Sequence, residues 1–129
     1  ALHQLTEYIK HVAERPFLNK SLERNAVREK WMEKYKNNNS NPLRPEGLMA
    51  SINKFIKDDA VISADVGTAT VWSTRYLNHG VNNKFIISSW LGTMGCGLPG
   101  AMASKIAYPN RPAIAIAGDG AFKMVTPSP

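Results

Sequence analysis

The sequence predicts an α/β fold in which a partial, doubly wound parallel sheet is preceded by helices from the end of a middle domain. Two observations favour this fold class. After residue 44, short apolar runs of strand character alternate with segments of helical periodicity, which is the pattern of strand–helix–strand units. Glycine-containing turns also recur at residues 65–68, 92–95 and 118–121. In an open parallel sheet such turns lie beyond the carboxyl ends of the strands, where ligands bind.

The first part of the chain is expected to form two helices. Apolar residues recur at helical spacing over residues 2–14, which predicts an amphipathic helix there. Pro16 is expected to end this helix or to start a loop. A second helix is expected over residues 21–36. The residues expected to form its buried face are Val27, Trp31 and Tyr35.

A polar segment then separates two parts of the chain. Residues 37–44 begin with the run Asn-Asn-Asn-Ser-Asn-Pro, which has no apolar residue and predicts a linker. We therefore expect residues 1–36 to be the carboxyl end of a middle domain, and residues 45–129 to be the truncated amino-terminal half of the next domain.

Three elements are expected directly after the linker. Pro45 and Glu46 suit the first turn of a helix that carries apolar residues as far as Ile56. The apolar run at residues 60–64 predicts a short strand. A helix is expected over residues 68–78.

The remaining elements repeat this alternation. Residues 85–87 are a second strand candidate, and a glycine-rich turn leads from them to a helix of small residues at 101–107. The run Ala-Ile-Ala-Ile-Ala at residues 113–117 predicts a buried parallel strand. This strand delivers Asp119 to a turn between two glycines.

The composition is that of a soluble globular protein. The chain is 43% hydrophobic and 20% charged, with no apolar run long enough to span a membrane. A single cysteine fits a reducing compartment, so we expect a cytoplasmic location. The net charge is +6, but acidic and basic residues alternate over residues 20–36, which is typical of a solvated helix face. A basic, non-enzymatic binding module is a weaker alternative, and no nucleic-acid partner is expected.

The segment Gly95-Cys96-Gly97-Leu98-Pro99-Gly100 matches the dinucleotide-binding pattern G-x-G-x-x-G. Three features weaken that interpretation. Seven residues separate it from the preceding strand candidate, and Leu98-Pro99 suits a turn of free N–H groups poorly. Asp119, which has the spacing of a ribose-binding acid, is enclosed by glycines that favour close backbone approach to phosphate.

A diphosphate site formed by several strand ends together is the stronger interpretation. The N–H groups of Gly120 and Ala121, together with Thr68, could hold a diphosphate. Such a group requires a cation, and Asp119 can supply an oxygen ligand to it. One carboxylate is too few to hold Mg²⁺, so phosphate oxygens, waters and further protein ligands would complete the site.

At these residues the sequence resembles thiamine diphosphate enzymes of the acetolactate synthase and pyruvate oxidase family. The resemblance rests on Asp-Val-Gly-Thr at residues 65–68, Trp-Leu-Gly-Thr-Met-Gly-Cys-Gly-Leu-Pro-Gly-Ala at 90–101 and Gly-Asp-Gly-Ala-Phe at 118–122. It covers roughly residues 43–125. Within the family the segments at 88–97 and 108–111 look most similar to bacterial pyruvate oxidase, and residues 1–36 resemble the end of a flavin-binding domain.

The resemblance implies a role for each matching position. Asp119 would ligate the magnesium ion, Gly120 and Ala121 would donate backbone N–H groups to the diphosphate, and Met94 would be the apolar wedge that bends thiamine. The carbonyl group of Gly92 would accept a hydrogen bond from the aminopyrimidine. The full set of implied cofactor-binding residues is Gly67, Thr68, Gly92, Met94, Gly118, Asp119, Gly120 and Ala121.

The activity implied is flavin-linked oxidative decarboxylation of pyruvate, with thiamine diphosphate, Mg²⁺ and FAD as cofactors. Phosphate and oxygen would be the other substrates, and acetyl phosphate, carbon dioxide and peroxide the products. FAD would bind mainly through regions outside this chain. The alternative within the family is an acetolactate synthase-type carboligase. A homo-oligomer is expected, because in this family the cofactor site is shared between subunits.

Some parts of the family's site are missing from this sequence. The asparagine-containing second half of the metal motif and the glutamate that activates the pyrimidine lie outside it. We therefore expect the chain to be a fragment that is inactive alone and contains no catalytic residue. The two prolines of Thr126-Pro127-Ser128-Pro129 would break a helix, so this tail is expected to be foreign sequence.

Overall fold

The computed structural model describes residues 2–9, 14–36 and 40–126. The chain divides into two compact units, residues 1–35 and 36–129, which are described separately. Of the tail expected at residues 126–129, only Thr126 lies within the described residues.

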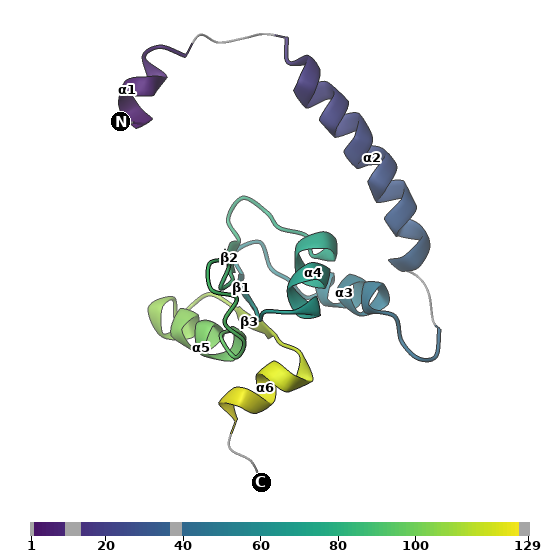
Figure 1. Cartoon of the computed structure of the whole chain (residues 1–129), viewed down its shortest axis with the longest axis vertical. Coiled ribbons are helices and arrows are strands. Elements are labelled where there is room, and N and C mark those ends of the chain that lie inside the picture. Colours follow the sequence, from purple (N-terminus) through teal and green to yellow (C-terminus); the bar gives the residue numbers. More distant parts are fainter. Residues whose placement is uncertain (1, 10–13, 37–39, 127–129) are drawn as a thin grey trace. The chain divides into compact units, whose positions relative to one another are not determined.

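The first unit contains helices α1, Leu2–Thr6, and α2, Pro16–Lys36 (Figure 1). The prediction of one helix over residues 2–14 is wrong, because residues 7–9, 14 and 15 are not helical. Pro16 begins α2, since the first turn of a helix does not need the N–H group that proline lacks.

The predicted buried face of α2 is also wrong. The side chains of Val27 and Trp31 are 69% and 57% exposed, because the five-residue α1 is the only other described helix of this unit and is too short to cover them. The Trp31 ring instead packs edge-on against that of Tyr35, with centroids 5.1 Å apart. This i,i+4 contact stabilises the helix locally without burying it.

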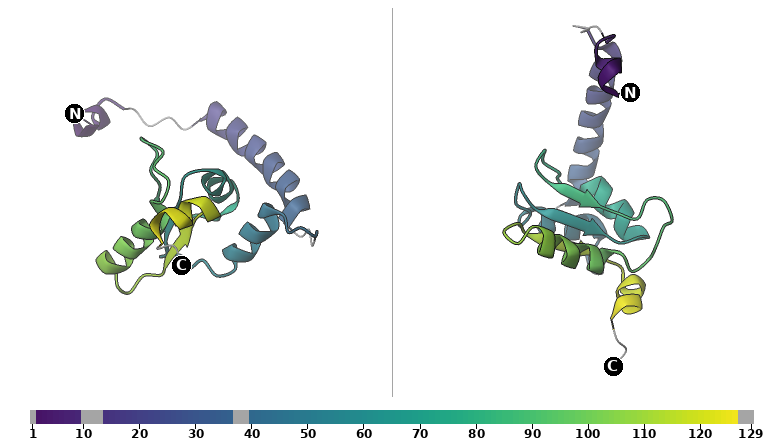
Figure 2. Two further views of the ribbon diagram at one scale, coloured as in Figure 1. Left: turned by 60° about the horizontal axis from the view of Figure 1, so that its bottom comes forward. Right: turned by 90° about the vertical axis from the view of Figure 1, so that its left-hand side faces the viewer.

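The second unit contains a three-stranded parallel sheet, as predicted. Strand β1, Val61–Ala64, lies between β2, Lys84–Ile86, and β3, Ala113–Ile116. Ile62 pairs with Phe85 on one side and with Ile114 on the other. Figure 2 shows the strands side by side.

Helices lie on both faces of this sheet. Helix α5, Gly97–Ala107, packs on β1 and β3, and helix α4, Thr68–Tyr76, contacts β1 and α3, Pro45–Asn53. Figures 1 and 2 show α5 on one side of the strands and α3 with α4 on the other. A short helix α6, Asp119–Val125, follows β3. The α/β, doubly wound fold class is therefore confirmed.

The core is centred on β1, whose four residues are all buried. A strand covered on both faces has no polar face, which explains why Val61, Ile62 and Ala64 are apolar and why the Ser63 hydroxyl is buried. The expectation that β3 is equally buried is wrong: Ala113 and Ile114 are half-buried and Ala115 is exposed. β3 is an edge of the described sheet, so only α5 and β1 cover it.

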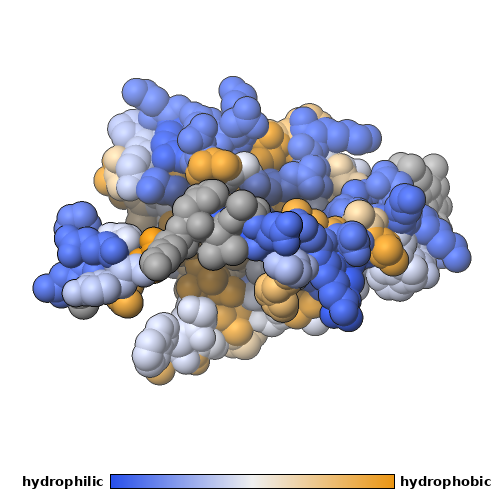
Figure 3. Space-filling view, turned by 90° about the horizontal axis from the view of Figure 1, so that it is seen from above, coloured by the Kyte–Doolittle hydropathy of each residue, from blue (hydrophilic) through white to orange (hydrophobic). Residues whose placement is uncertain are grey.

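Two further boundaries differ from expectation. Helix α3 ends at Asn53, which leaves Phe55 outside it and 79% exposed. Helix α5 begins at Gly97, four residues earlier than predicted, inside the glycine-rich turn. Large apolar side chains are exposed in both units, and Figure 3 shows hydrophobic groups beside hydrophilic ones on the face that it displays.

Candidate functional site

The candidate site lies where three glycine turns meet the carboxyl ends of β1 and β3. Gly67 precedes α4, Gly118 precedes α6, and the loop at residues 92–96 leads into α5. Gly67, Gly92 and Gly95 have φ angles of 120°, 62° and 86°. These angles lie in the region that glycine adopts without strain, so the turns depend on glycine.

Asp65 ties two of these turns together. It follows β1 directly and is fully buried. One carboxylate oxygen, Oδ1, accepts the N–H groups of Val66 at 2.8 Å and Gly95 at 2.9 Å, and the other, Oδ2, accepts that of Gly97 at 2.8 Å. Its backbone carbonyl accepts the hydroxyl of Thr70 in α4 at 2.6 Å. Asp65 therefore links β1, α4 and the glycine-rich loop.

Two glycines of the G-x-G-x-x-G pattern, Gly97 and Gly100, allow close packing of α5 on β1 and on Asp65, which follows it. A Cβ atom on Gly97 would lie 2.9 Å from the carboxylate and Cβ of Asp65, and one on Gly100 would overlap the hydroxyl of Ser63. The N–H groups of Gly95 and Gly97 are already bonded to Asp65. This arrangement speaks against the dinucleotide interpretation, because those N–H groups are not available to a phosphate.

The amino ends of α4 and α6 have the opposite character. Each is preceded by a glycine N-cap, Gly67 or Gly118, with no side-chain cap. A Cβ atom on either glycine would meet nothing within 4 Å. Within residues 40–126, no backbone or side-chain acceptor is bonded to the N–H groups of Thr68, Gly120 or Ala121. Unpaired N–H groups at two helix amino ends fit an anionic group such as a diphosphate.

The two helix ends are neighbours. Thr68 and Gly118 line one cavity of about 290 Å³, together with residues of α3, α4 and the end of β3. The cavity thus joins Thr68, which the sequence assigned to one side of the diphosphate, and Gly118, whereas Gly120 and Ala121 are not among its lining residues.

The loop at residues 92–95 lies against the same region. A Cβ atom on Gly120 would be 4.0 Å from the terminal methyl carbon of Met94, and one on Gly92 would be 3.9 Å from Val66. The Met94 side chain is 46% exposed. The carbonyl oxygen of Gly92 accepts no hydrogen bond from the described residues, so it is available to a donor on a ligand.

Asp119 is exposed in the first turn of α6. No group of three or more His, Cys, Asp or Glu side chains that could hold a metal lies within the described ranges. A cation here would therefore take one carboxylate from this chain and its other ligands from elsewhere, as the sequence indicated.

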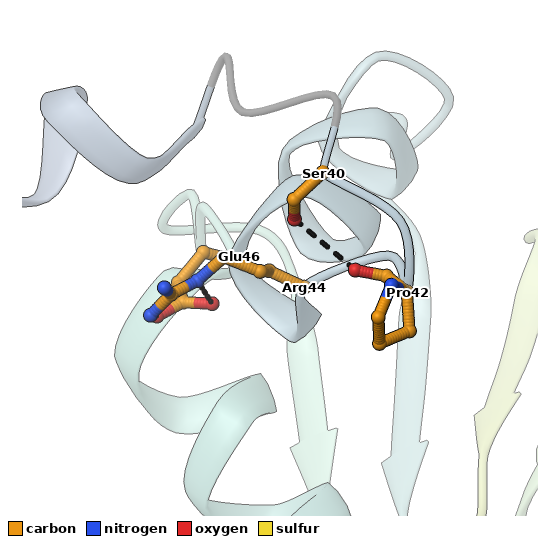
Figure 4. Close-up of polar contacts among 4 residues, drawn as sticks. All are labelled: Ser40, Pro42, Arg44 and Glu46. Atoms are coloured by element: carbon orange, nitrogen blue, oxygen red, sulfur yellow. Dashed lines mark hydrogen bonds and ion pairs between the residues drawn. The ribbon is translucent and has the colours of Figure 1, made fainter.

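An ion pair lies at the edge of the shared cavity, at the amino end of α3 (Figure 4). The Arg44 guanidinium is 3.4 Å from the carboxylate of Glu46, which is almost fully buried. The backbone N–H of Glu46 and the Arg44 side chain hold the pKa of this carboxyl below its ordinary value, although burial opposes the shift. Just before the helix, the Ser40 hydroxyl donates to the carbonyl of Pro42 at 3.1 Å.

Comparison with known protein families agrees with this geometry. Residues 65–128 match the model of the thiamine pyrophosphate enzyme family, at its C-terminal thiamine pyrophosphate-binding domain. These residues, just under half of the chain, therefore form a domain that is similar to that family's. Thiamine pyrophosphate is thiamine diphosphate under its other name, and the members of the family are enzymes.

The curated relatives are longer than this chain. A Bacillus subtilis protein, YdaP, whose name describes it as thiamine pyrophosphate-containing, is 47% identical over 126 residues, which is 96% of this chain and 22% of the relative. Pyruvate oxidase of Lactiplantibacillus plantarum is 39% identical over 83 residues, 64% of this chain and 14% of the relative. An acetolactate synthase large subunit of Lactococcus lactis is 37% identical over 82 residues, again 64% and 14%. The chain therefore spans about a fifth or less of these proteins.

The part that sequence reasoning missed is the role of Asp65. The residue belonged to a recognised motif, but its three N–H partners became visible only in the structure. An acidic residue directly after a buried strand was the available signal, since a buried carboxylate requires several donors. In addition, none of the described helices is long and apolar enough to cross a membrane.

Proposed function

We propose that the protein carrying this chain is a thiamine diphosphate- and magnesium-dependent enzyme that acts on pyruvate, and that this chain supplies part of the cofactor site. The observation that carries the proposal is the pair of helices without side-chain caps, α4 and α6: Thr68, the first residue of α4, and Gly118, the N-cap of α6, line one cavity, and Asp119 follows Gly118 in the chain. The family match of residues 65–128 supports it.

The polar groups of the site have two tasks, which are to bind the diphosphate and to bind the magnesium ion. The N–H groups of Gly120 and Ala121 donate to the diphosphate from one side, and Thr68 with the Gly67 turn holds it from the other. Gly118 leaves the space above α6 open. Asp119 contributes one carboxylate oxygen to the magnesium ion, because carboxylate and phosphate oxygens are the ligands that this ion prefers.

The loop at residues 92–95 faces the other end of the cofactor. The Gly92 carbonyl accepts a hydrogen bond from the aminopyrimidine, and the Met94 side chain fills the space beneath the bend of the molecule. A flexible, polarisable methionine suits such an irregular gap. When bound, the cofactor supplies the electron sink for decarboxylation of a 2-keto acid, while the protein supplies orientation.

For the complete protein we propose flavin-linked oxidation of pyruvate with phosphate and oxygen, giving acetyl phosphate, carbon dioxide and peroxide. FAD, the homo-oligomeric state, a site shared between subunits and a cytoplasmic location belong to this proposal. Acetolactate synthase-type carboligation of pyruvate is the second candidate, because relatives named for the two activities are almost equally identical to this chain.

The experiment that tests the site is Asp119→Ala in the full-length protein. Losing a direct metal ligand should weaken magnesium-dependent binding of thiamine diphosphate by about 100-fold or more, since even outer partners of a metal site are worth about 10–100-fold. The exposed position of Asp119 predicts a change in unfolding free energy within about 0.5 kcal/mol. Isothermal titration with thiamine diphosphate and Mg²⁺ measures the affinity.

The matched control is Asp58→Ala, which removes an exposed carboxylate from the loop before β1. It should bind the cofactor like the wild type. Unchanged affinity in the Asp119 variant would contradict the assignment of the metal ligand.

A further inference from the structure

Asp65 is a buried carboxylate that the proposed cofactor contacts do not use. It is fully buried, and none of the ion pairs in the described part of the chain involves it. A lone buried carboxylate is costly unless several donors surround it. The N–H groups of Val66, Gly95 and Gly97 supply those donors, and bonds of this charge-assisted kind are among the stronger hydrogen bonds in proteins.

These bonds fix the loop that carries Gly92 and Met94. Gly95 stands next to Met94, and Gly97 is the first residue of α5. Both N–H groups reach a carboxylate that lies 30 or more residues earlier in the chain. The loop is thus attached to the end of β1 and to the start of α5 through one side chain.

The loop is also close to the diphosphate turn. The Met94 methyl carbon lies near Gly120, and Gly95 packs so tightly on α6 that a Cβ atom there would be 2.9 Å from Val125. A displaced loop would therefore move Met94 relative to the diphosphate-binding N–H groups. Those groups themselves lie on α4 and α6 and make no bond to the Asp65 carboxylate.

We propose that Asp65 is a positioning residue, whose carboxylate orders the loop at residues 92–97 before thiamine diphosphate binds. The inference rests on the proposed function, because the loop orients that cofactor. Under this proposal the affinity for the cofactor and the orientation of the cofactor depend on different residues. Affinity depends on the diphosphate contacts, whereas the orientation of the reacting ring depends on Asp65 through Gly92 and Met94.

Asp65→Asn is the discriminating variant. Asparagine has the same shape as aspartate, but an NH₂ group replaces one of the two carboxylate oxygens. This NH₂ group is a hydrogen-bond donor, so it cannot accept a hydrogen bond from a backbone N–H group. When the amide oxygen takes the position of Oδ1, the hydrogen bond that the Gly97 N–H donates to Oδ2 is lost, whereas the packing of β1 is unchanged. Asp58→Asn is the matched control, since it makes the same chemical change at an exposed position.

The first measurement uses the cofactor-free, full-length protein. Backbone amide hydrogen exchange of the peptide at residues 90–100 should be at least tenfold faster in Asp65→Asn than in the wild type, and unchanged in Asp58→Asn. Equal exchange in both variants would overturn the proposal. If Asp65→Asn does not fold, the wild type decides alone: the Gly95 and Gly97 amides must be protected like those of β1, and exchange as fast as that of the exposed loop at residues 81–82 refutes the ordering.

The second measurement adds thiamine diphosphate with Mg²⁺ and pyruvate. In Asp65→Asn the kcat should fall at least tenfold, while the Kd of thiamine diphosphate stays within threefold of the wild type. A parallel loss of affinity and turnover, or an unchanged kcat, would refute the positioning role. Failure of the wild type to bind thiamine diphosphate would instead refute the proposed function, and the positioning role with it.

Discussion

Two aspartates at neighbouring strand ends have opposite environments. Asp65 follows β1 and is buried, and Asp119 follows β3 and is exposed. Both lie within a few residues of a glycine turn, so the local sequence does not separate them. The difference comes from the N–H groups of Gly95 and Gly97, which surround only Asp65. The sequence named Asp119 as the metal ligand, but it could not show that Asp65 is buried among backbone N–H donors.

At the same scale, Met94→Ala tests the wedge. Removing the side chain that lies near Gly120 should leave the diphosphate contacts intact but let the bound cofactor relax from its bend. Turnover of the full-length enzyme should fall on the order of 10- to 100-fold, the range expected for a misplaced reacting group, with flavin content unchanged. Met102→Ala, which truncates an exposed methionine of α5, is the control. Equal losses of turnover and flavin would count against the wedge.

Glu46 provides a prediction about pH. Its folded-state pKa is lowered, so the stability that it contributes is present above its unfolded pKa, near 4.3, and disappears as the pH falls through the lower folded value. Because the partner Arg44 is partly exposed, Glu46→Gln should cost only about 0.5 kcal/mol at pH 7. Urea unfolding of the variant and the wild type at pH 7 and pH 3 measures the difference. A gap that stays the same from pH 7 to pH 3 would contradict the ionic origin.

Among the elements, the glycine-rich segment has a sequence pattern that predicts one role and a packing that shows another. Its glycines match a dinucleotide fingerprint, yet they allow α5 to approach Asp65 and Ser63 of the β1 segment. The positions of the strands followed from apolar runs and were predicted to within a residue or two. The start of α5 and the exposure of β3 did not follow, because each depends on which neighbouring element packs against it. The start of α2 did not follow either, because Pro16 was expected to end a helix or to start a loop, whereas it is the first residue of α2.

The contact of α5 with β1 predicts a coupled pair of mutations. Gly100→Ala would place a methyl group on the Ser63 hydroxyl and should destabilise the fold by about 1–3 kcal/mol, as overpacking does. Ser63→Ala alone should be neutral or stabilising, because this buried hydroxyl has no hydrogen-bond partner among the described residues. In the double variant the Gly100→Ala change should cost less than it does alone. Thermal unfolding of the four proteins checks this, and strictly additive effects would show that the two sites do not touch.

For the molecule as a whole, the family was predictable because three ordered motifs converge on one edge of a sheet. The activity was harder to predict from the sequence, because the chain spans 22% of its B. subtilis relative and 14% of the pyruvate oxidase relative. Residues 65–128 match the thiamine pyrophosphate-binding domain, and relatives named for both activities are similar to this chain.

A product assay on the full-length protein decides between them. With pyruvate, phosphate, Mg²⁺ and thiamine diphosphate, the oxidase should bleach a bound flavin without oxygen and should form acetyl phosphate and peroxide with oxygen. The same mixture without phosphate serves as the control for acetyl phosphate. Formation of acetolactate with no change in flavin absorbance would instead support the carboligase.

The bonds from Gly95 and Gly97 to Asp65 also have a consequence for folding. They join residues 30 and 32 positions apart, and the entropy of closing a segment of that length must be overcome before the contact stabilises anything. The loop can reach its native shape only after β1 has formed and α5 has docked on it. Turnover, rather than cofactor affinity, would then report on how far the chain has completed its long-range assembly, and a short peptide containing Met94 could not reproduce the loop.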